Sequence, residues 1–430
     1  MFRNSYALAR GRAPRLLRFS APLIVFMVGA ATLAAVPLAQ AATTPAKTFT
    51  VSSTLGWQQT PINLKAGQAY TVSYVSGTWT VDYRNFPQVG PRGYSNSVDR
   101  TIYQGCKYNP DSNYAVLLGV VGNSAAAFPI GEGGIFNASS SGPLYLRIND
   151  DNACLVDNAG SVKMYISPVV GVPNYNYAGY TASAGGKGAF GLVQATWVVP
   201  KLTVPLQCFS NWNATPRAAA WVGLWGTNDS INKRTAWLPQ IGTESICNQD
   251  VNGRRHDGRN YWAFWEMYTA VSRGGAKGHG SAVQPIPSMT IEPGDTMTGV
   301  VEYDGKSGSD LVFSLQLFDV TRGKPGSPDQ FFIKVTTTKP VSFSDITAQG
   351  GAVVEPDCNI EGLANFTPVP FTDVQAVSWN GTPQPAGVSV NKWTMIGSNK
   401  ATLARPGPLS GFPGLMRYTV TWDASGPTAC

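Results

Sequence analysis

Short runs in which apolar and polar residues alternate occur along most of the chain after residue 47. In the first half they include "AYTVSYVSGTWTV" (69–81) and "SVKMYI" (161–166), and in the second half "AAAWVGLW" (218–225) and "YWAFWEMYT" (261–269). Gly, Asn and Pro separate these runs, and alternation between such turn signals predicts β-strands. No segment shows sustained helical periodicity. The pattern therefore predicts an all-β protein.

The strand-like runs form two groups. One group spans residues 48–168, and the other spans 181–430. Between them, residues 169–180 are rich in Pro, Asn and Tyr, which is typical of a linker. We therefore expect two β-sandwich domains of the jelly-roll type, joined by this short linker.

The first 41 residues have the pattern of a cleaved signal peptide. Five arginines precede the apolar stretch Ala21–Leu38, and Ala39-Gln40-Ala41 is a small-x-small cleavage site. The alternative is an uncleaved membrane anchor, because the apolar stretch is nearly long enough to span a bilayer. We predict a secreted protein, extracellular or periplasmic, that has no membrane partner after cleavage.

Charge and cysteine content agree with an exported protein. The formal net charge is +7, and removing the five leader arginines leaves 7 − 5 = +2, which gives no argument for a nucleic-acid partner. Six cysteines in an exported chain suggest disulfides, although six allow fifteen pairings. Thiolate metal binding is the alternative. Proximity along the chain favours the pairs Cys106–Cys154, Cys208–Cys247 and Cys358–Cys430.

The histidine content limits the chemistry of the second domain. Only His256 and His279 occur, both in turns rich in glycine and basic residues, and there is no HExxH motif. Hydrolysis in this domain would therefore use carboxylates, amides and water. Glu266 is a candidate, because it lies inside the aromatic run 261–269. In a strand it would share one face with Trp262, Phe264 and Tyr268.

Several motifs in residues 180–430 together resemble the eqolisins, or glutamic peptidases. These motifs are "GAFGLVQATWVVP", "AAAWVGLWG", "LPQIG", "YWAFWEMYT", "IEPGDTM" and "GGAVVEPD". The resemblance implies a β-sandwich that cleaves peptide bonds in acid with a Gln and Glu pair. Three positions depart from the family pattern: Trp225 replaces an aspartate, Pro239 replaces an apolar residue, and "EW" is missing before the last glutamate.

Carried over by motif, the resemblance makes Gln240 and Glu355 the catalytic pair. Glu355 would take a proton from water, and the Gln240 amide would donate to the oxyanion. Crowding of acidic residues would raise at least one pKa and favour work in acid. The supporting and substrate-binding positions are Trp221, Glu266, Glu244, Trp262, Phe264 and Tyr268. The glycine-rich stretch Arg273–Ser281 would be a mobile flap. No cofactor is expected for catalysis.

The first domain resembles the calcium-dependent galactophilic lectins, a family of small jelly-roll sandwiches. The resemblance rests on "WQQTPINLKAGQAYTVSYVSGTWTVD", "VGPRGYS", "LLGVVG" and "LYLRINDDNACLVDNAGS". It implies one Ca²⁺ site, and oxygen ligands of this kind suit calcium. An Asx-rich hairpin without metal is the alternative. The family's sugar-contacting histidine is missing, and Tyr94 and Asn96 stand nearby instead. The implied ligands are the side chains of Asp150, Asp157 and Asn158 and the carbonyl oxygens of Cys154 and Asp82.

The sequence thus favours a secreted endopeptidase acting in acid on protein or peptide substrates, with a calcium-binding lectin-like module. Two alternatives remain on the same pair of sandwiches. One is a non-catalytic secreted protein that binds carbohydrate or mediates adhesion. The other is a carbohydrate-active hydrolase, since an aromatic sheet with paired Glu residues also suits polysaccharide cleavage.

Overall fold

The computed structural model describes most of the chain from residue 47 onward. The described residues are 47–122, 126–174, 176–184, 190–203, 215–225, 236–250, 254–270, 283–324, 327–337, 347, 349–356, 363–378, 388–397, 400–410 and 416–423. The expected signal peptide (1–41) and the expected flap (273–281) lie outside them. The described residues are nearly all in strands and turns, so the all-β prediction is confirmed.

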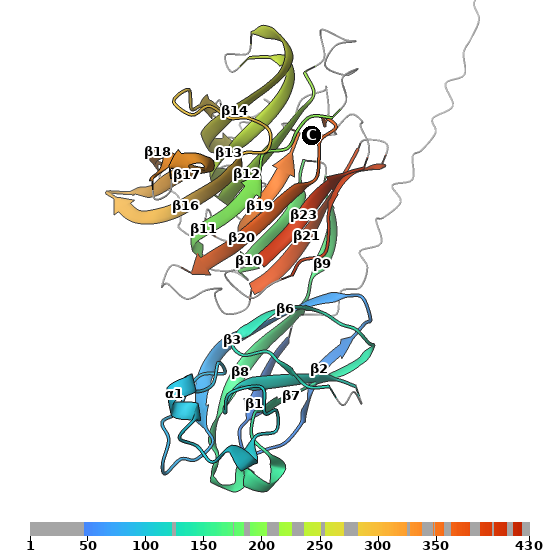
Figure 1. The fold of residues 1–430 in the computed structure, drawn as a ribbon, viewed down its shortest axis with the longest axis vertical. Coiled ribbons are helices and arrows are strands. Elements are labelled where there is room, and N and C mark those ends of the chain that lie inside the picture. The colour runs from blue at the N-terminus through green and yellow to red at the C-terminus, as the bar shows by residue number, and fades with distance from the viewer. Residues whose placement is uncertain are drawn as a thin grey trace, which may run out of the picture. The chain divides into compact units, whose positions relative to one another are not determined.

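The N-terminal strands form two antiparallel sheets that share one core (Figure 1). In the described part of this region, one sheet has the order β1-β8-β3-β6 and the other β2-β7-β4-β5. Trp79, Tyr70 and Leu146 are buried between them. The strands are β1 (Lys47–Ser52), β2 (Gln58–Leu64), β3 (Ala69–Thr80), β4 (Leu117–Val121), β5 (Phe128–Pro129), β6 (Gly133–Asn137), β7 (Gly142–Ile148) and β8 (Ala159–Pro168).

Short helical turns and one disulfide complete the N-terminal sandwich. The turns are α1 (Asn96–Asp99), η1 (Gln104–Cys106) and η2 (Asn152–Asp157). Cys106 and Cys154 are bonded, as predicted from proximity along the chain, and their Cα atoms are 6.0 Å apart. This bond ties η1 to η2, which carries part of the expected calcium motif. Cys247 also takes part in a disulfide; Cys208, Cys358 and Cys430 lie outside the described residues.

The C-terminal strands form one long sheet in the described residues, with the order β15-β14-β13-β12-β19-β10-β21-β22-β23-β20-β11-β16-β17-β18. In addition, β9 pairs with β21. The strands are β9 (Val170–Asn174), β10 (Ala178–Ala184), β11 (Phe190–Val198), β12 (Arg217–Trp225), β13 (Ala236–Gln249), β14 (Arg255–Ala270), β15 (Gln284–Pro285), β16 (Thr296–Ser307), β17 (Asp310–Lys324), β18 (Ser327–Thr336), β19 (Gln349–Glu355), β20 (Val369–Ser378), β21 (Val388–Ile396), β22 (Thr402–Pro406) and β23 (Met416–Trp422).

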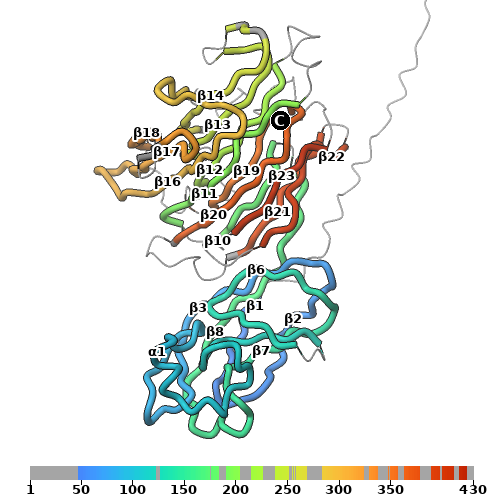
Figure 2. Tube along the Cα trace, in the orientation of Figure 1, coloured from blue at the N-terminus to red at the C-terminus, as the bar shows by residue number. Residues whose placement is uncertain are grey.

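The long sheet folds back on itself, so that its two halves enclose the main core. Strands β11, β16 and β17 pack against β12 and β13, and β20 packs against β19. Trp197, Val222 and Ile241 are buried in this core. Strands β19, β12, β13 and β14 run side by side in the tube view (Figure 2). Each of these four strands therefore has one face toward the main core and one face away from it.

Residues 169–180, expected to be a linker, instead contain β9 and the start of β10. Strand β9 pairs in parallel with β21, while β10 pairs with the opposite edge of β21. The Pro and Asn residues suggested a turn, but the partner strand lies more than 200 residues further along the chain. Pro173 is compatible with β9, because proline is tolerated in edge strands.

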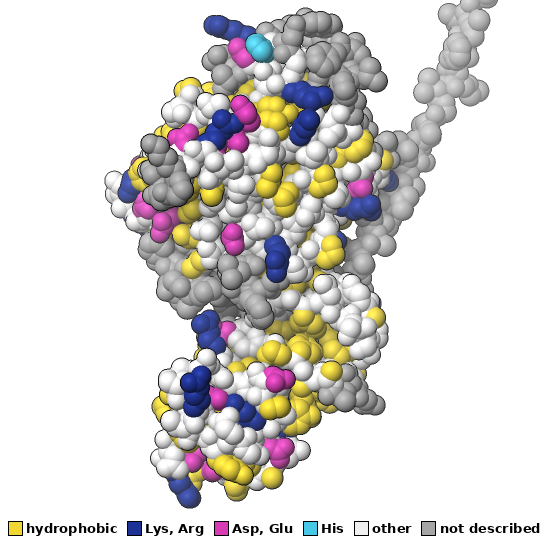
Figure 3. Space-filling model, in the orientation of Figure 1, with side chains coloured by type: hydrophobic (Ala, Val, Ile, Leu, Met, Phe, Trp, Pro, Cys, Tyr) yellow, Lys and Arg dark blue, Asp and Glu magenta, His cyan; other side chains and the backbone are white. Residues whose placement is uncertain are grey.

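Basic and acidic side chains are interspersed on the described part of the face drawn in Figure 3, and no large patch of one charge is seen there. Within the described residues, no helix is long and apolar enough to cross a membrane.

Candidate active site

One face of four adjacent strands carries the polar residues that the sequence singles out. We use "outer face" for the face of β19, β12, β13 and β14 that points away from the main core. In β14, Ala263 and Met267 enter the main core, whereas Phe264 belongs to a second, smaller apolar cluster on the outer face. The same alternation places Glu266 on the outer face, as the sequence pattern predicts.

Strand pairing sets the positions of these residues relative to one another. Gln240 of β13 lies opposite Glu266 of β14. Ala219 of β12 lies between Glu355 of β19 on one side and Glu244 of β13 on the other. Pairing between residues so distant in sequence brings both members of the predicted Gln/Glu pair to the same face.

Trp221 connects β12 to the candidate base. Its indole Nε1 donates to Glu355 Oε2 at 2.8 Å, and only 2% of Trp221 is exposed. Gly242 lies opposite Trp221, and a Cβ atom at Gly242 would come within 2.5 Å of the Trp221 Cβ. The glycine of "LPQIG" therefore allows the tryptophan to lie close against β13. Because this N–H bond favours the ionised carboxylate, it suits a general base.

Gln240 and Glu266 are joined directly. Gln240 Nε2 donates to Glu266 Oε2 at 2.6 Å, and each residue is 6% exposed. The Gln240 Oε1 atom is buried and has no hydrogen-bond partner among the described residues. A primary amide has two N–H donors, and the bond to Glu266 uses one of them.

Glu244, expected to support the pair, is bound to a residue that the motifs did not include. Arg217 Nη1 lies 3.0 Å from Glu244 Oε1, and Arg217 Nη2 donates to Gln249 Oε1 at 3.1 Å. The side chains are 15% and 5% exposed for Arg217 and Glu244. The alternation of β12 could have revealed Arg217, because it shares a face with Trp221.

Aromatic side chains surround the Trp221–Glu355 contact. Tyr177 packs edge-on against Trp221, Trp225 and Trp393, with ring centroids 5.5–6.5 Å apart. Trp393 is anchored through Nε1 to Thr181 Oγ1 at 2.8 Å. Burial and then the Glu355 charge raise the pKa of Tyr177. Neither Tyr177 nor Trp393 was predicted, since both lie outside the compared motifs.

Trp262, Phe264 and Tyr268 lie on the same face of β14 as Glu266. Phe264 is buried and Trp262 is partly buried in the outer apolar cluster. Burial raises the pKa of Tyr268, and the charges of Glu266 and Glu355 raise it further. Both carboxylates are thus close enough to act on one phenol, although they lie on different strands.

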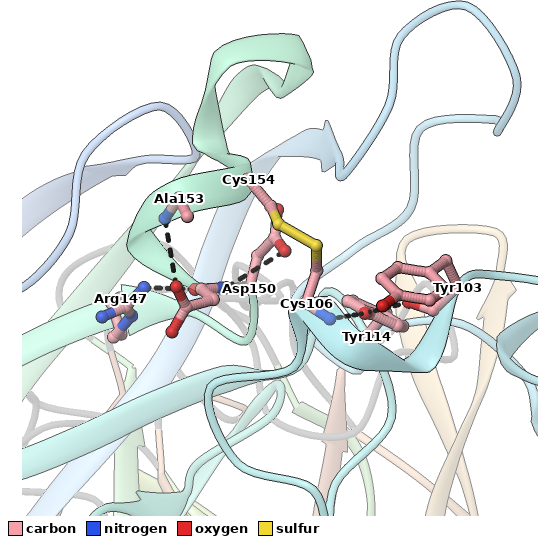
Figure 4. The surroundings of a disulfide bond; sticks show 8 residues. Tyr103, Cys106, Tyr114, Arg147, Asp150, Ala153 and Cys154 are labelled. Carbon is pink, nitrogen blue, oxygen red and sulfur yellow. Dashed lines mark hydrogen bonds between the residues drawn. A yellow bond between two sulfur atoms is a disulfide. The ribbon is translucent and has the colours of Figure 1, made fainter.

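The expected calcium segment contains η2, and its residues Asp150, Ala153 and Cys154 lie around the disulfide to Cys106 (Figure 4). Asp150 and Asn158 are buried, and burial raises the pKa of Asp150 to about 7, with a further rise from Asp157 and an opposing hydrogen bond from Asn158. Asn158 Oδ1 is buried without a partner among the described residues. Asp150 therefore interacts with both of the other expected side-chain ligands.

The two expected carbonyl ligands lie in different surroundings. The Asp82 carbonyl already accepts from Phe86 N at 3.0 Å and from Thr80 Oγ1 at 3.1 Å. Cys154 lies in η2, where its disulfide to Cys106 holds it. No group of three His, Cys, Asp or Glu side chains suited to a metal occurs in the described part of the chain, so a cation here would need the Asn158 amide as well.

Comparison with known proteins assigns the family. The sequence model of the peptidase A4 family matches residues 175–405, which is more than half of the chain. The chain belongs to the peptidase A4 family. The matched region of this peptidase includes Trp221, Gln240, Glu266 and Glu355. A search of curated proteins found no match.

Solved structures give more distant similarities. Scytalido-glutamic peptidase with a transition state analog inhibitor matches with 18% identity and a TM-score of 0.39, covering 58% of this chain and 98% of that one. The same enzyme with a peptide-based analog matches with 17% identity and a TM-score of 0.37, with the same coverage. The N-terminal domain of EclA, a PllA-like lectin, matches with 22% identity and a TM-score of 0.23, covering 28% of this chain and 94% of that chain.

Proposed function

We propose that this A4-family peptidase is a glutamic endopeptidase that works in acid, with Glu355 as general base and Gln240 as oxyanion donor. The proposal rests on the arrangement of Glu355 and Gln240 on the outer face. Glu355 on β19 is held by Trp221 Nε1, and Gln240 on β13 is held by Glu266; these two strands flank β12, and both side chains project from the same side of one sheet. Family membership supports a protein or peptide substrate.

The reaction follows from these groups. Ionised Glu355 removes a proton from water while the water oxygen attacks the scissile carbonyl carbon, and the carbonyl π electrons move onto oxygen. The second N–H of Gln240 donates to that oxygen. When the C–N bond breaks, the proton on Glu355 passes to the leaving nitrogen. Each step uses side chains of the chain and water, and the carboxylate returns to its starting form.

The decisive experiment is digestion of a denatured protein at about pH 3–5, near the ordinary pKa of Glu of about 4.3. Glu355→Gln and Gln240→Ala should each abolish cleavage while retaining the wild-type melting temperature. Glu302→Gln, on β16 away from the outer face, is the matched control and should keep full activity. Full activity in purified Glu355→Gln would reject the assignment. Reducing-end release from polysaccharides by wild type would instead favour the carbohydrate-active alternative.

We also propose that the protein is exported. The leader pattern of residues 1–41 and the Cys106–Cys154 disulfide support this, because disulfides persist mainly in oxidising compartments. N-terminal sequencing of the mature protein should begin at Ala42. A mature chain that retains Met1 would contradict cleavage.

The N-terminal sandwich is proposed to bind one Ca²⁺ through Asp150, Asp157 and Asn158. The supporting observation is the buried Asn158 Oδ1 beside a buried carboxylate, since both are oxygen donors that calcium accepts. The cation would order this loop. Glycan-array binding by the full chain would test the carbohydrate partner, with calcium present and absent.

A further inference from the structure

Tyr268 lies on the outer face and carries a hydroxyl group that the proposed reaction does not use. It follows Glu266 by two residues on β14, so both side chains project from the same face. Its backbone lies opposite Leu238, next to the pair formed by Gln240 and Glu266. The side chain is partly exposed, and its hydroxyl makes no hydrogen bond among the described residues.

Two acidic residues interact electrostatically with the Tyr268 hydroxyl. Glu266 of β14 and Glu355 of β19 both act on it, whereas Glu244, the third acid of this face, is bound to Arg217. Burial and the two carboxylates raise the pKa of Tyr268 above its ordinary value of 10.0. The phenol therefore keeps its proton through the acid range and beyond neutrality, and it remains a hydrogen-bond donor throughout.

The oxyanion of the proposed reaction can accept a hydrogen bond from a second donor. Gln240 uses one N–H on Glu266, which leaves a single N–H for the developing oxyanion. Oxyanion sites commonly present more than one donor, and removing a single donor costs about 100- to 1000-fold in kcat. Tyr268 follows Glu266, the register partner of Gln240, on the same face of β14, and its hydroxyl is an uncharged donor without a hydrogen-bond partner among the described residues.

We propose that Tyr268 is a catalytic residue that donates its hydroxyl hydrogen bond to the scissile carbonyl oxygen, alongside Gln240. This inference rests on the proposed peptidase function. The bond strengthens as negative charge develops on that oxygen, and no proton is transferred. A role limited to ring packing would need only the phenyl group, and a role as donor to Glu355 would act on the base instead of the substrate.

The test is Tyr268→Phe in the full chain, which removes only the hydroxyl. Acid cleavage of a fluorogenic peptide should show kcat reduced by about 100-fold. KM, the acid limb of the kcat/KM profile and the melting temperature should stay at wild-type values. Tyr261→Phe is the matched control: it lies on the same strand, faces the main core and already accepts a hydrogen bond from Leu202 N at 3.3 Å. It should retain wild-type kcat.

Two results would overturn the inference. One is an unchanged kcat in Tyr268→Phe, which would reduce the residue to packing. The other is an acid limb that moves to higher pH, which would show that the hydroxyl serves Glu355. An inactive wild-type enzyme would count against the proposed function and is distinguishable from both, because each comparison starts from measurable wild-type cleavage.

Discussion

Trp221 and Glu355 are joined by a 2.8 Å hydrogen bond between the indole Nε1 and Oε2, although 134 residues separate them in sequence. The bond crosses from β12 to β19, whose pairing places Trp221 opposite Val353 and Ala219 opposite Glu355. Trp221 is buried, and Tyr177 and Trp225 pack on its ring. Packing therefore holds the donor in place, and a fixed donor favours the ionised form of its acceptor.

Trp221→Phe removes this donor and keeps an aromatic ring. A hydrogen bond to a charged group contributes about 1.5–3 kcal/mol, so kcat/KM should fall by about tenfold to a hundredfold at the working pH. The acid limb of the pH profile should move to higher pH, because the ionised carboxylate loses a partner. Trp197→Phe is the control, since its indole donates to Thr243 Oγ1 at 2.9 Å in the main core. An unmoved acid limb in Trp221→Phe would contradict the role.

Arg217 and Glu244 form a largely buried ion pair, so removing one partner leaves the other charge unpaired. Arg217→Met should lower the free energy of unfolding at neutral pH by about 3–5 kcal/mol, as measured by urea denaturation. The double variant Arg217→Met with Glu244→Gln should recover part of that loss, because no buried charge remains. Equal stability of wild type and Arg217→Met would show that the pair is not important for the fold.

The face assignments could be read from the sequence because they depend on local alternation. In "YWAFWEMYT" the period of two separates Glu266 and Phe264 from Ala263 and Met267 without any knowledge of neighbouring strands. The motif resemblance then pointed to Gln240 and Glu355. Neither the alternation nor the motif resemblance gives the register of β13 against β14. That register places Gln240 opposite Glu266.

Other features depend on partners that are distant in sequence. Arg217 directly precedes the predicted strand run 218–225, and its ion pair with Glu244 follows only from the β12–β13 register. The segment expected to be a linker contains β9 because its residues pair with an edge of β21. In both cases a residue's local pattern was compatible with two states, and a long-range pairing selected one of them.

Asp319 should make the stability of the folded protein depend on pH. Its side chain is fully buried within β17, where Oδ1 accepts from Thr321 N and Arg322 N. Burial is the main cause of its raised pKa, with Asp295 adding to the rise. A raised acid pKa means that the residue's favourable contribution is full below the ordinary pKa and is lost as pH rises through the folded value.

Asp319→Asn should therefore raise the melting temperature at pH 7 and leave it unchanged near pH 3, where the wild-type carboxyl is neutral. The amide oxygen can still accept the two backbone N–H bonds, so the local turn is retained. Asp310→Asn, at the start of the same strand, is the control and should show no such pH-dependent gain. A loss of stability at pH 7 in Asp319→Asn would mean that attraction to Arg322, whose Nε lies 3.6 Å from Oδ2, outweighs the cost of burying the charge.

Calcium should stabilise the N-terminal sandwich if the loop around η2 holds it. In the proposed site Asn158 Oδ1 gains a partner and the carboxylates of Asp150 and Asp157 gain a counter-charge. At a free concentration of 100 times Kd, one bound ion adds about 2.7 kcal/mol to the free energy of unfolding.

Titration calorimetry of the EDTA-treated full chain should show one Ca²⁺ site, with Mg²⁺ binding more weakly because it demands stricter octahedral geometry. Asp157→Asn should weaken the binding, whereas Asp111→Asn, a control carboxylate outside the proposed ligand set, should leave it unchanged. Wild-type protein that releases no heat and melts at the same temperature with and without Ca²⁺ would assign the loop to an Asx-rich turn. In that case the buried Asn158 oxygen would be satisfied by water.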